Sequence, residues 1–124
     1  MWGADRRGIR LSPPGTFDEL GDDDPQATFG YVAEKRNAYD LADLHVVNPN
    51  TSDAGAKAMK AMRERGTLIV ADGFDREKAE AWLQQGKADL TAFGRSFLAN
   101  PDLPERFRQR AELNADDLST YLWW

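Results

Sequence analysis

The sequence predicts an α/β fold in which four strand–helix units follow one another, and three observations support it. Short runs rich in Leu, Ile and Val have the length of strands: "GIRLS" (8–12), "LADLHVV" (41–47), "TLIVA" (67–71) and "ADLTAF" (88–93). Each run is followed by a segment with a helical pattern. The runs recur roughly every 20 to 35 residues, which suits parallel strands joined by right-handed helical crossovers.

The expected helices have recognisable ends. They cover, in order, residues 25–39, 54–66, 76–86, 96–99 and 103–110. Pro25 can occupy a first helical turn behind an aspartate cap, Asp75 is an expected N-cap, and Gly86 ends the helix that Asp75 begins. Core positions are expected at Trp82, Phe97 and Phe107, which lie at helical spacings.

Four strand–helix units are half of a (βα)8 barrel, which usually needs about 250 residues. The chain of 124 residues is therefore expected to form one (βα)4 half-barrel domain over 1–124, with its inner face and two sheet edges exposed. Exposed edges favour pairing, so we expect a homodimer in which the fourth strand of one copy meets the first strand of the other. The alternative is a monomer whose strands rearrange into an open flavodoxin-like sheet.

Composition excludes several classes of function. There is no cysteine, so disulfides and thiolate metal sites are excluded, and the net charge of -5 disfavours a nucleic-acid partner. No apolar run reaches the length of a signal peptide core or a membrane span, so a cytoplasmic protein is expected. His45 is the only histidine; in a strand it is expected to be a packed or edge residue, and no spacing suggests a metal site.

The quoted strands and the segments between them resemble a known family. The matching stretches are "GIRLSPPGTFDELGDDDPQATFGYV", "LADLHVV", "TLIVADGFDREKAEAWLQQGKADLTAFGRSFLANPDLPERF" and "LNADD". They are similar to the C-terminal half of the old yellow enzymes, FMN-dependent TIM-barrel oxidoreductases that take hydride from NAD(P)H and reduce activated alkenes. The resemblance implies barrel strands five to eight.

The resemblance also implies what is missing. In the family, the His and Asn that bind the substrate and the Tyr that donates a proton belong to the N-terminal half, and no motif of this chain matches them. We therefore expect an excised or engineered half-barrel that is not active as an enzyme by itself, with no catalytic residue of its own. The closing "STYLWW" replaces the end that is usual in the family.

The resemblance assigns four residues to FMN. Arg10 would lie beside the N1 and O2 region of the flavin ring, where its fork stabilises negative charge. Gly94 and Arg95 match the turn that binds the phosphate, and Gly73 would let the backbone approach that phosphate from a second turn. The plainer alternatives are that Arg10 pairs with a nearby carboxylate, that Gly94 only permits a tight turn, and that Arg95 faces solvent.

Asp72 departs from the family pattern, because the family has a glycine at this position. A carboxylate ~4 Å from a phosphate oxygen would cost roughly 4 kcal/mol per unit charge at an effective dielectric constant near 20. Two functions therefore remain open. One is a half-barrel with a residual FMN or phosphate site, which would be yellow; the other is a non-catalytic, self-associating scaffold without a cofactor, which would be colourless.

Overall fold

The computed structural model describes residues 3–12, 23–36, 38–47, 66–117 and 119. The chain forms two compact units, residues 1–92 and 93–124, and each is described by itself. The expectation of a single domain stays a prediction. Among the described residues, no helix is both long and apolar enough to cross a bilayer.

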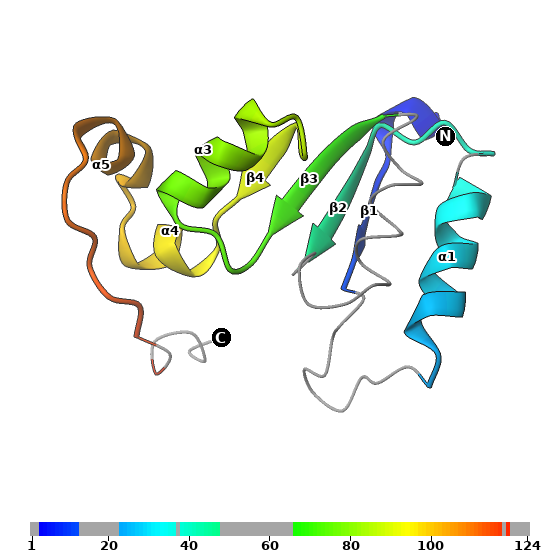
Figure 1. The fold of residues 1–124 in the computed structure, drawn as a ribbon, viewed down its shortest axis with the longest axis horizontal. Helices are drawn as coiled ribbons and strands as arrows, with labels where there is room; N and C mark the ends of the chain where they lie inside the picture. The colour runs from blue at the N-terminus through cyan, green and yellow to red at the C-terminus, as the bar shows by residue number, and fades with distance from the viewer. Residues whose placement is uncertain (1–2, 13–22, 37, 48–65, 118, 120–124) are drawn as a thin grey trace. The chain divides into compact units, whose positions relative to one another are not determined.

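The first unit is built on a sheet of four parallel strands (Figure 1). They are β1 (Gly8–Leu11), β2 (Asp43–Val47), β3 (Thr67–Ala71) and β4 (Leu90–Ala92). Their order in space is their order in the chain, β1-β2-β3-β4, and every neighbouring pair is parallel. This order confirms the predicted (βα)4 arrangement. It excludes the flavodoxin-like alternative, whose strand order is not sequential.

Alternating side chains give this sheet two different faces. We call one the packed face; it holds the most deeply buried strand residues, Leu44, Val46, Leu68 and Val70. We call the other the open face; apart from the small buried side chain of Ala71, its described side chains are exposed or half-buried, and the ones used below are Arg10, Asp43, His45, Ile69 and Leu90. The large buried side chains of the described strands therefore lie on one side of the sheet.

The first helix, α1 (Pro25–Arg36), begins as the sequence predicts. The Asp24 carboxylate accepts a hydrogen bond from the Ala27 amide at 3.0 Å, which satisfies a donor that the first turn leaves unpaired. The helix ends at Arg36 instead of the expected residue 39. A short 3-10 helix, η1 (Ala4–Arg6), precedes β1. Nearly all of the helix expected over 54–66 lies outside the described residues.

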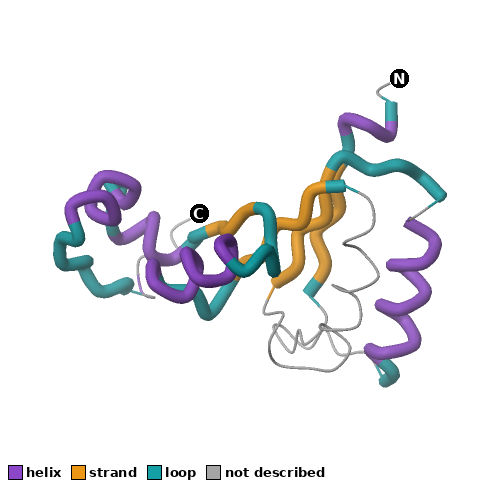
Figure 2. Tube along the Cα trace, turned by 45° about the horizontal axis from the view of Figure 1, so that its top comes forward, coloured by secondary structure: helices purple, strands orange, loops and turns teal. Residues whose placement is uncertain are grey.

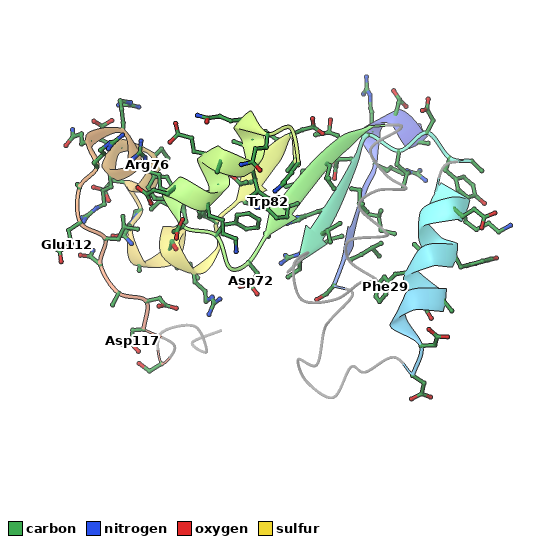
Figure 3. All side chains as sticks on the ribbon, viewed as in Figure 1. Phe29, Asp72, Arg76, Trp82, Glu112 and Asp117 are labelled. Atoms are coloured by element: carbon green, nitrogen blue, oxygen red, sulfur yellow. The ribbon has the colours of Figure 1, made fainter. Side chains whose placement is uncertain are left out.

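Helix α3 (Arg76–Gln84) follows β3 and precedes β4, and it confirms the predicted N-cap and the predicted stop before Gly86. Helices such as α3 are purple in Figure 2 and strands are orange. Asp75 is the N-cap, because its Oδ1 accepts a hydrogen bond from the Lys78 amide at 2.7 Å. Gly86 has φ +62, a left-handed conformation that favours glycine, and the helix stops before it. Trp82 is half-buried and meets the Phe74 ring edge to face, with ring centroids 5.1 Å apart (Figure 3).

The second unit contains α4 (Arg95–Ala99) and α5 (Leu103–Gln109), close to the predicted spans. Asn100 is fully buried and ties the segment after α5 back to α4: its Oδ1 accepts from the Asn114 amide at 2.8 Å, and its Nδ2 donates to the Ser96 carbonyl at 2.9 Å. Phe107 packs on Phe93 with ring centroids 5.1 Å apart.

Phe97 corrects the predicted core, because its side chain is 46% exposed. Helix α4 has five residues and makes little more than one turn. Helical spacing within so short a segment does not determine which side of it becomes buried.

Candidate functional site

Arg10 lies on the open face, near the carboxyl end of β1. Its strand neighbour across the sheet is His45 of β2. The Arg10 side chain is exposed and, among the described residues, forms no hydrogen bond or ion pair, so the alternative in which it pairs with a nearby carboxylate, such as Asp5 or Asp72, is not seen. A guanidinium at the carboxyl edge of parallel strands stands where barrel proteins place their ligands.

The turn after β3 holds two consecutive residues in the left-handed region, Asp72 with φ +69 and Gly73 with φ +71. Glycine adopts this conformation without cost, whereas a side chain is strained there. Figure 3 labels Asp72 at this turn. The backbone thus explains why glycine occupies position 73, and it shows that Asp72 is held in a conformation better suited to glycine.

Lys78 is a residue of this turn that the sequence reasoning missed. Its Nζ donates a hydrogen bond to the Gly73 carbonyl oxygen at 2.6 Å and lies 4.9 Å from the centre of the Phe74 ring. An ammonium group fixed to the backbone of the turn reduces the repulsion that Asp72 alone would exert on an anion. The signal in the sequence was a lysine in the first turn of the helix that follows "ADGF".

Gly94 immediately precedes α4, and its backbone does not require glycine, because its φ is -87. A Cβ built at this position would meet no heavy atom within 4 Å apart from the chain neighbours. Neither the backbone nor the packing of the described residues therefore explains the glycine, and the space beside it suits the close approach of a ligand. Arg95, the first residue of α4, is exposed.

The four predicted cofactor residues are divided between the two units. Arg10 and Gly73 belong to the first unit, where both stand toward the carboxyl ends of parallel strands separated by β2. Gly94 and Arg95 belong to the second unit. A joint site made by all four stays a prediction. The described residues contain no group of three His, Asp or Glu side chains that could hold a metal ion.

His45 is half-buried at the middle of β2, on the open face. Its Nε2 is shielded from solvent and has no hydrogen-bond partner among the described residues. Burial lowers the pKa of His45, the charge of Arg10 lowers it further, and Asp43 opposes both. The imidazole is thus neutral at neutral pH. The prediction of a packed strand residue did not foresee that Nε2 has no hydrogen-bond partner among the described residues.

Comparison with known proteins gives consistent results. Residues 1–114 match the model of the NADH:flavin oxidoreductase / NADH oxidase family. The chain is 43% identical to 12-oxophytodienoate reductase 2 of Arabidopsis thaliana over 126 residues, covering 96% of this chain and 34% of that protein. It is 41% identical to 12-oxophytodienoate reductase 1 of Oryza sativa subsp. japonica over 127 residues, covering 96% of this chain and 33% of that protein.

Among solved structures, morphinone reductase in complex with tetrahydroNAD superposes with a TM-score of 0.78 and 45% sequence identity. The match covers 92% of this chain and 31% of that chain. This chain therefore spans about a third of the length of the proteins it resembles.

Proposed function

Because the chain belongs to the NADH:flavin oxidoreductase / NADH oxidase family, we propose that it is a half-barrel that retains an FMN-binding site and lacks the residues for turnover by itself. Arg10 binds the pyrimidine side of the flavin ring, and Gly73, Gly94 and Arg95 hold the phosphate. FMN, when bound, supplies the group that accepts and gives up hydride. The chain spans 34% of 12-oxophytodienoate reductase 2, and our proposal places the substrate-binding and proton-donating residues in the part that it does not span.

The observation that carries this proposal is the unpaired Arg10 on the open face. A planar guanidinium with five donors suits the N1 and O2 edge of a flavin, on which negative charge gathers when the ring is reduced. Gly94 adds a second argument, since the space beside it is not used by the described residues. Arg10 thus supports the proposed contact with the flavin ring, Gly94 supports the proposed phosphate contact, and the charge of Asp72 opposes an anion.

Titration with FMN tests the proposal. We expect a saturable change in tryptophan fluorescence below about millimolar FMN, and a bound absorbance band between about 350 and 500 nm. Riboflavin, which lacks the phosphate, should bind more weakly. Arg10→Met should weaken FMN binding about tenfold. Arg7→Met removes an exposed arginine that lies outside the strand and serves as the matched control.

Absence of saturable binding by the wild-type chain would reject the proposed function. It would favour the colourless scaffold instead. If Arg10→Met and Arg7→Met lost the same amount of FMN affinity, Arg10 would act only through the overall charge of the protein.

We also propose that two copies associate, with β4 of each chain next to β1 of the other. The sequential strand order leaves β1 and β4 as the two edges of the sheet, and unpaired edges favour strand addition. Leu90 of β4 is 52% exposed and belongs to the open face, so association would also cover apolar surface. Eight strands in one closed sheet would leave no free edge.

A further inference from the structure

Two polar side chains without a hydrogen bond among the described residues lie next to each other on one face of the β1–β2 pair. Arg10 and His45 are register partners, so their Cα atoms are neighbours in adjacent strands and their side chains project to the same face. Arg10 has donors and no acceptor. His45 has an Nε2 that is shielded from solvent without a partner among the described residues. A buried polar atom without a hydrogen bond is destabilising, so its retention calls for an explanation.

The surroundings of the imidazole contain few other charges. On β2, Asp43 lies two residues before His45 on the open face, and its carboxylate lies over Gly8, where a Cβ would come within 2.2 Å of Asp43 Oδ1. On β3, the register partner is Ile69, which is apolar. The charged groups of the described sheet that face His45 are therefore Arg10 and Asp43.

We propose that His45 is a positioning residue for Arg10: its neutral imidazole accepts a hydrogen bond from the guanidinium through Nε2 and holds the remaining donors toward the ligand. The bond satisfies the shielded nitrogen and uses one of the five guanidinium donors. It also restricts a long side chain that is otherwise exposed, so that less conformational entropy is lost when a flavin binds. The ligand in this inference is that of the proposed function, whereas the proposed hydrogen bond between His45 and Arg10 is independent of it.

The inference fixes the sign of a pH effect. Protonated His45 has no lone pair to offer Arg10 and repels it, so FMN affinity should fall as the pH drops through the pKa of His45. If His45 instead bound the anionic ligand directly, protonation would add an attractive charge and affinity would rise. The direction of the change therefore separates positioning from direct binding.

A test without cofactor uses the fact that His45 is the only histidine. Nitrogen-15 NMR of the imidazole reports both its pKa and which nitrogen carries the proton in the neutral form. We expect the proton on Nδ1, which leaves Nε2 as the acceptor. Arg10→Met should raise the pKa of His45, and Asp43→Asn should lower it. A neutral form protonated on Nε2, or a pKa that Arg10→Met leaves unchanged, would overturn the inference.

The second test measures FMN affinity in two variants, at about pH 7.5 and at a pH below the His45 pKa that NMR determines. His45→Leu removes the acceptor and should weaken binding about tenfold at the higher pH. His45→Gln keeps an oxygen acceptor that does not titrate, so it should stay within about threefold of wild type and lose the dependence on pH. Wild-type affinity in His45→Leu would contradict the inference. If the wild-type chain binds no FMN, the proposed function fails, and the NMR result still decides whether His45 positions Arg10.

Discussion

The two faces of the parallel sheet differ in what they contribute. On the packed face, Leu44, Val46 and Val70 have no exposed surface, and all are aliphatic. On the open face, the row of register partners across the four strands reads Arg10, His45, Ile69 and Leu90, a mixture of charged, titratable and apolar side chains. Burial of side chains on the packed face therefore stabilises the fold. The open face carries the polar and titratable side chains that could bind a ligand.

This difference makes polar side chains of the open face easy to identify as candidate ligand-binding groups. In a closed barrel the inner face is covered, whereas here the same face remains exposed or half-buried. His45 Nε2 is such a group, because it has no hydrogen-bond partner among the described residues. The contrast between the faces can be tested by substitutions on each of them.

The largest effect is expected on the packed face. Leu44→Ala should lower the free energy of unfolding by about 3 kcal/mol, since it removes a fully buried side chain and leaves a cavity. Ile69→Ala on the open face is the matched control and should cost about 1 kcal/mol. Urea unfolding followed by tryptophan fluorescence measures both. Equal losses of unfolding free energy in Leu44→Ala and Ile69→Ala, measured at low protein concentration, would contradict the division into two faces.

Much of this contrast could be predicted from the sequence. The runs "LHVV" and "TLIVA" predicted strands because Leu, Ile and Val suit a buried pleated surface, and Asp75 and Gly86 predicted the ends of α3 because capping depends on local geometry. These features need only neighbours in the chain. The regular strand–helix repeat predicted parallel strands, and it left the sequential order and the flavodoxin-like order open until the structure showed the sequential one.

What could not be predicted depends on register and on contacts across the sheet. The pairing of Arg10 with His45 requires knowing that residues 35 positions apart are partners, which no local pattern reveals. Exposure of Phe97 depends on how one short helix packs. The contact of Lys78 with the Gly73 carbonyl depends on the left-handed turn after β3. The fold was thus easier to predict than the details of the candidate site.

The next largest effect is expected on self-association. Leu90→Lys places a charge on the open face of an edge strand and should weaken the proposed dimer at least about tenfold, with little change in the stability of the monomer. Leu83→Lys on α3 is the control, because Leu83 is 40% exposed and lies outside the sheet. Sedimentation velocity distinguishes a 13.9 kDa chain from its dimer. A wild-type chain that stays at 13.9 kDa at high concentration would exclude the association.

A smaller effect is expected from Asp72→Gly at the carboxyl edge of the sheet. The variant removes a negative charge near the proposed phosphate and should tighten FMN binding about tenfold, with riboflavin binding unchanged. It also relieves a left-handed backbone and should add about 0.5 to 1 kcal/mol of stability. Asp40→Gly is the matched control, since Asp40 also has positive φ, at +41, and belongs to a different loop. An equal gain in FMN affinity from both variants would contradict the assignment of Asp72 to the phosphate region.

The smallest effect is a pH dependence of stability from the open face. The pKa of His45 is lowered in the folded state by burial and by Arg10, so between that value and 6.5 the unfolded chain binds more protons than the folded one. The free energy of unfolding should therefore rise with pH across this window and level off above it. The slope should correspond to a difference of less than about one bound proton between the unfolded and folded chains. His45→Gln should abolish the slope, and Arg10→Met should reduce it, in urea unfolding measured at several pH values.

Two carboxylates also make stability depend on pH, and their effect occurs at a different pH from that of His45. The pKa of Asp102 is lowered by its hydrogen bond with Arg106, and that of Asp117 by its hydrogen bonds with Ser119. Their stabilisation is present above the usual carboxyl pKa of 3.8 and is lost as the pH falls through their lowered values. This loss occurs at more acidic pH than the titration of His45. A slope just below pH 6.5 that persists in His45→Gln would therefore show that a group other than the open-face histidine titrates on unfolding.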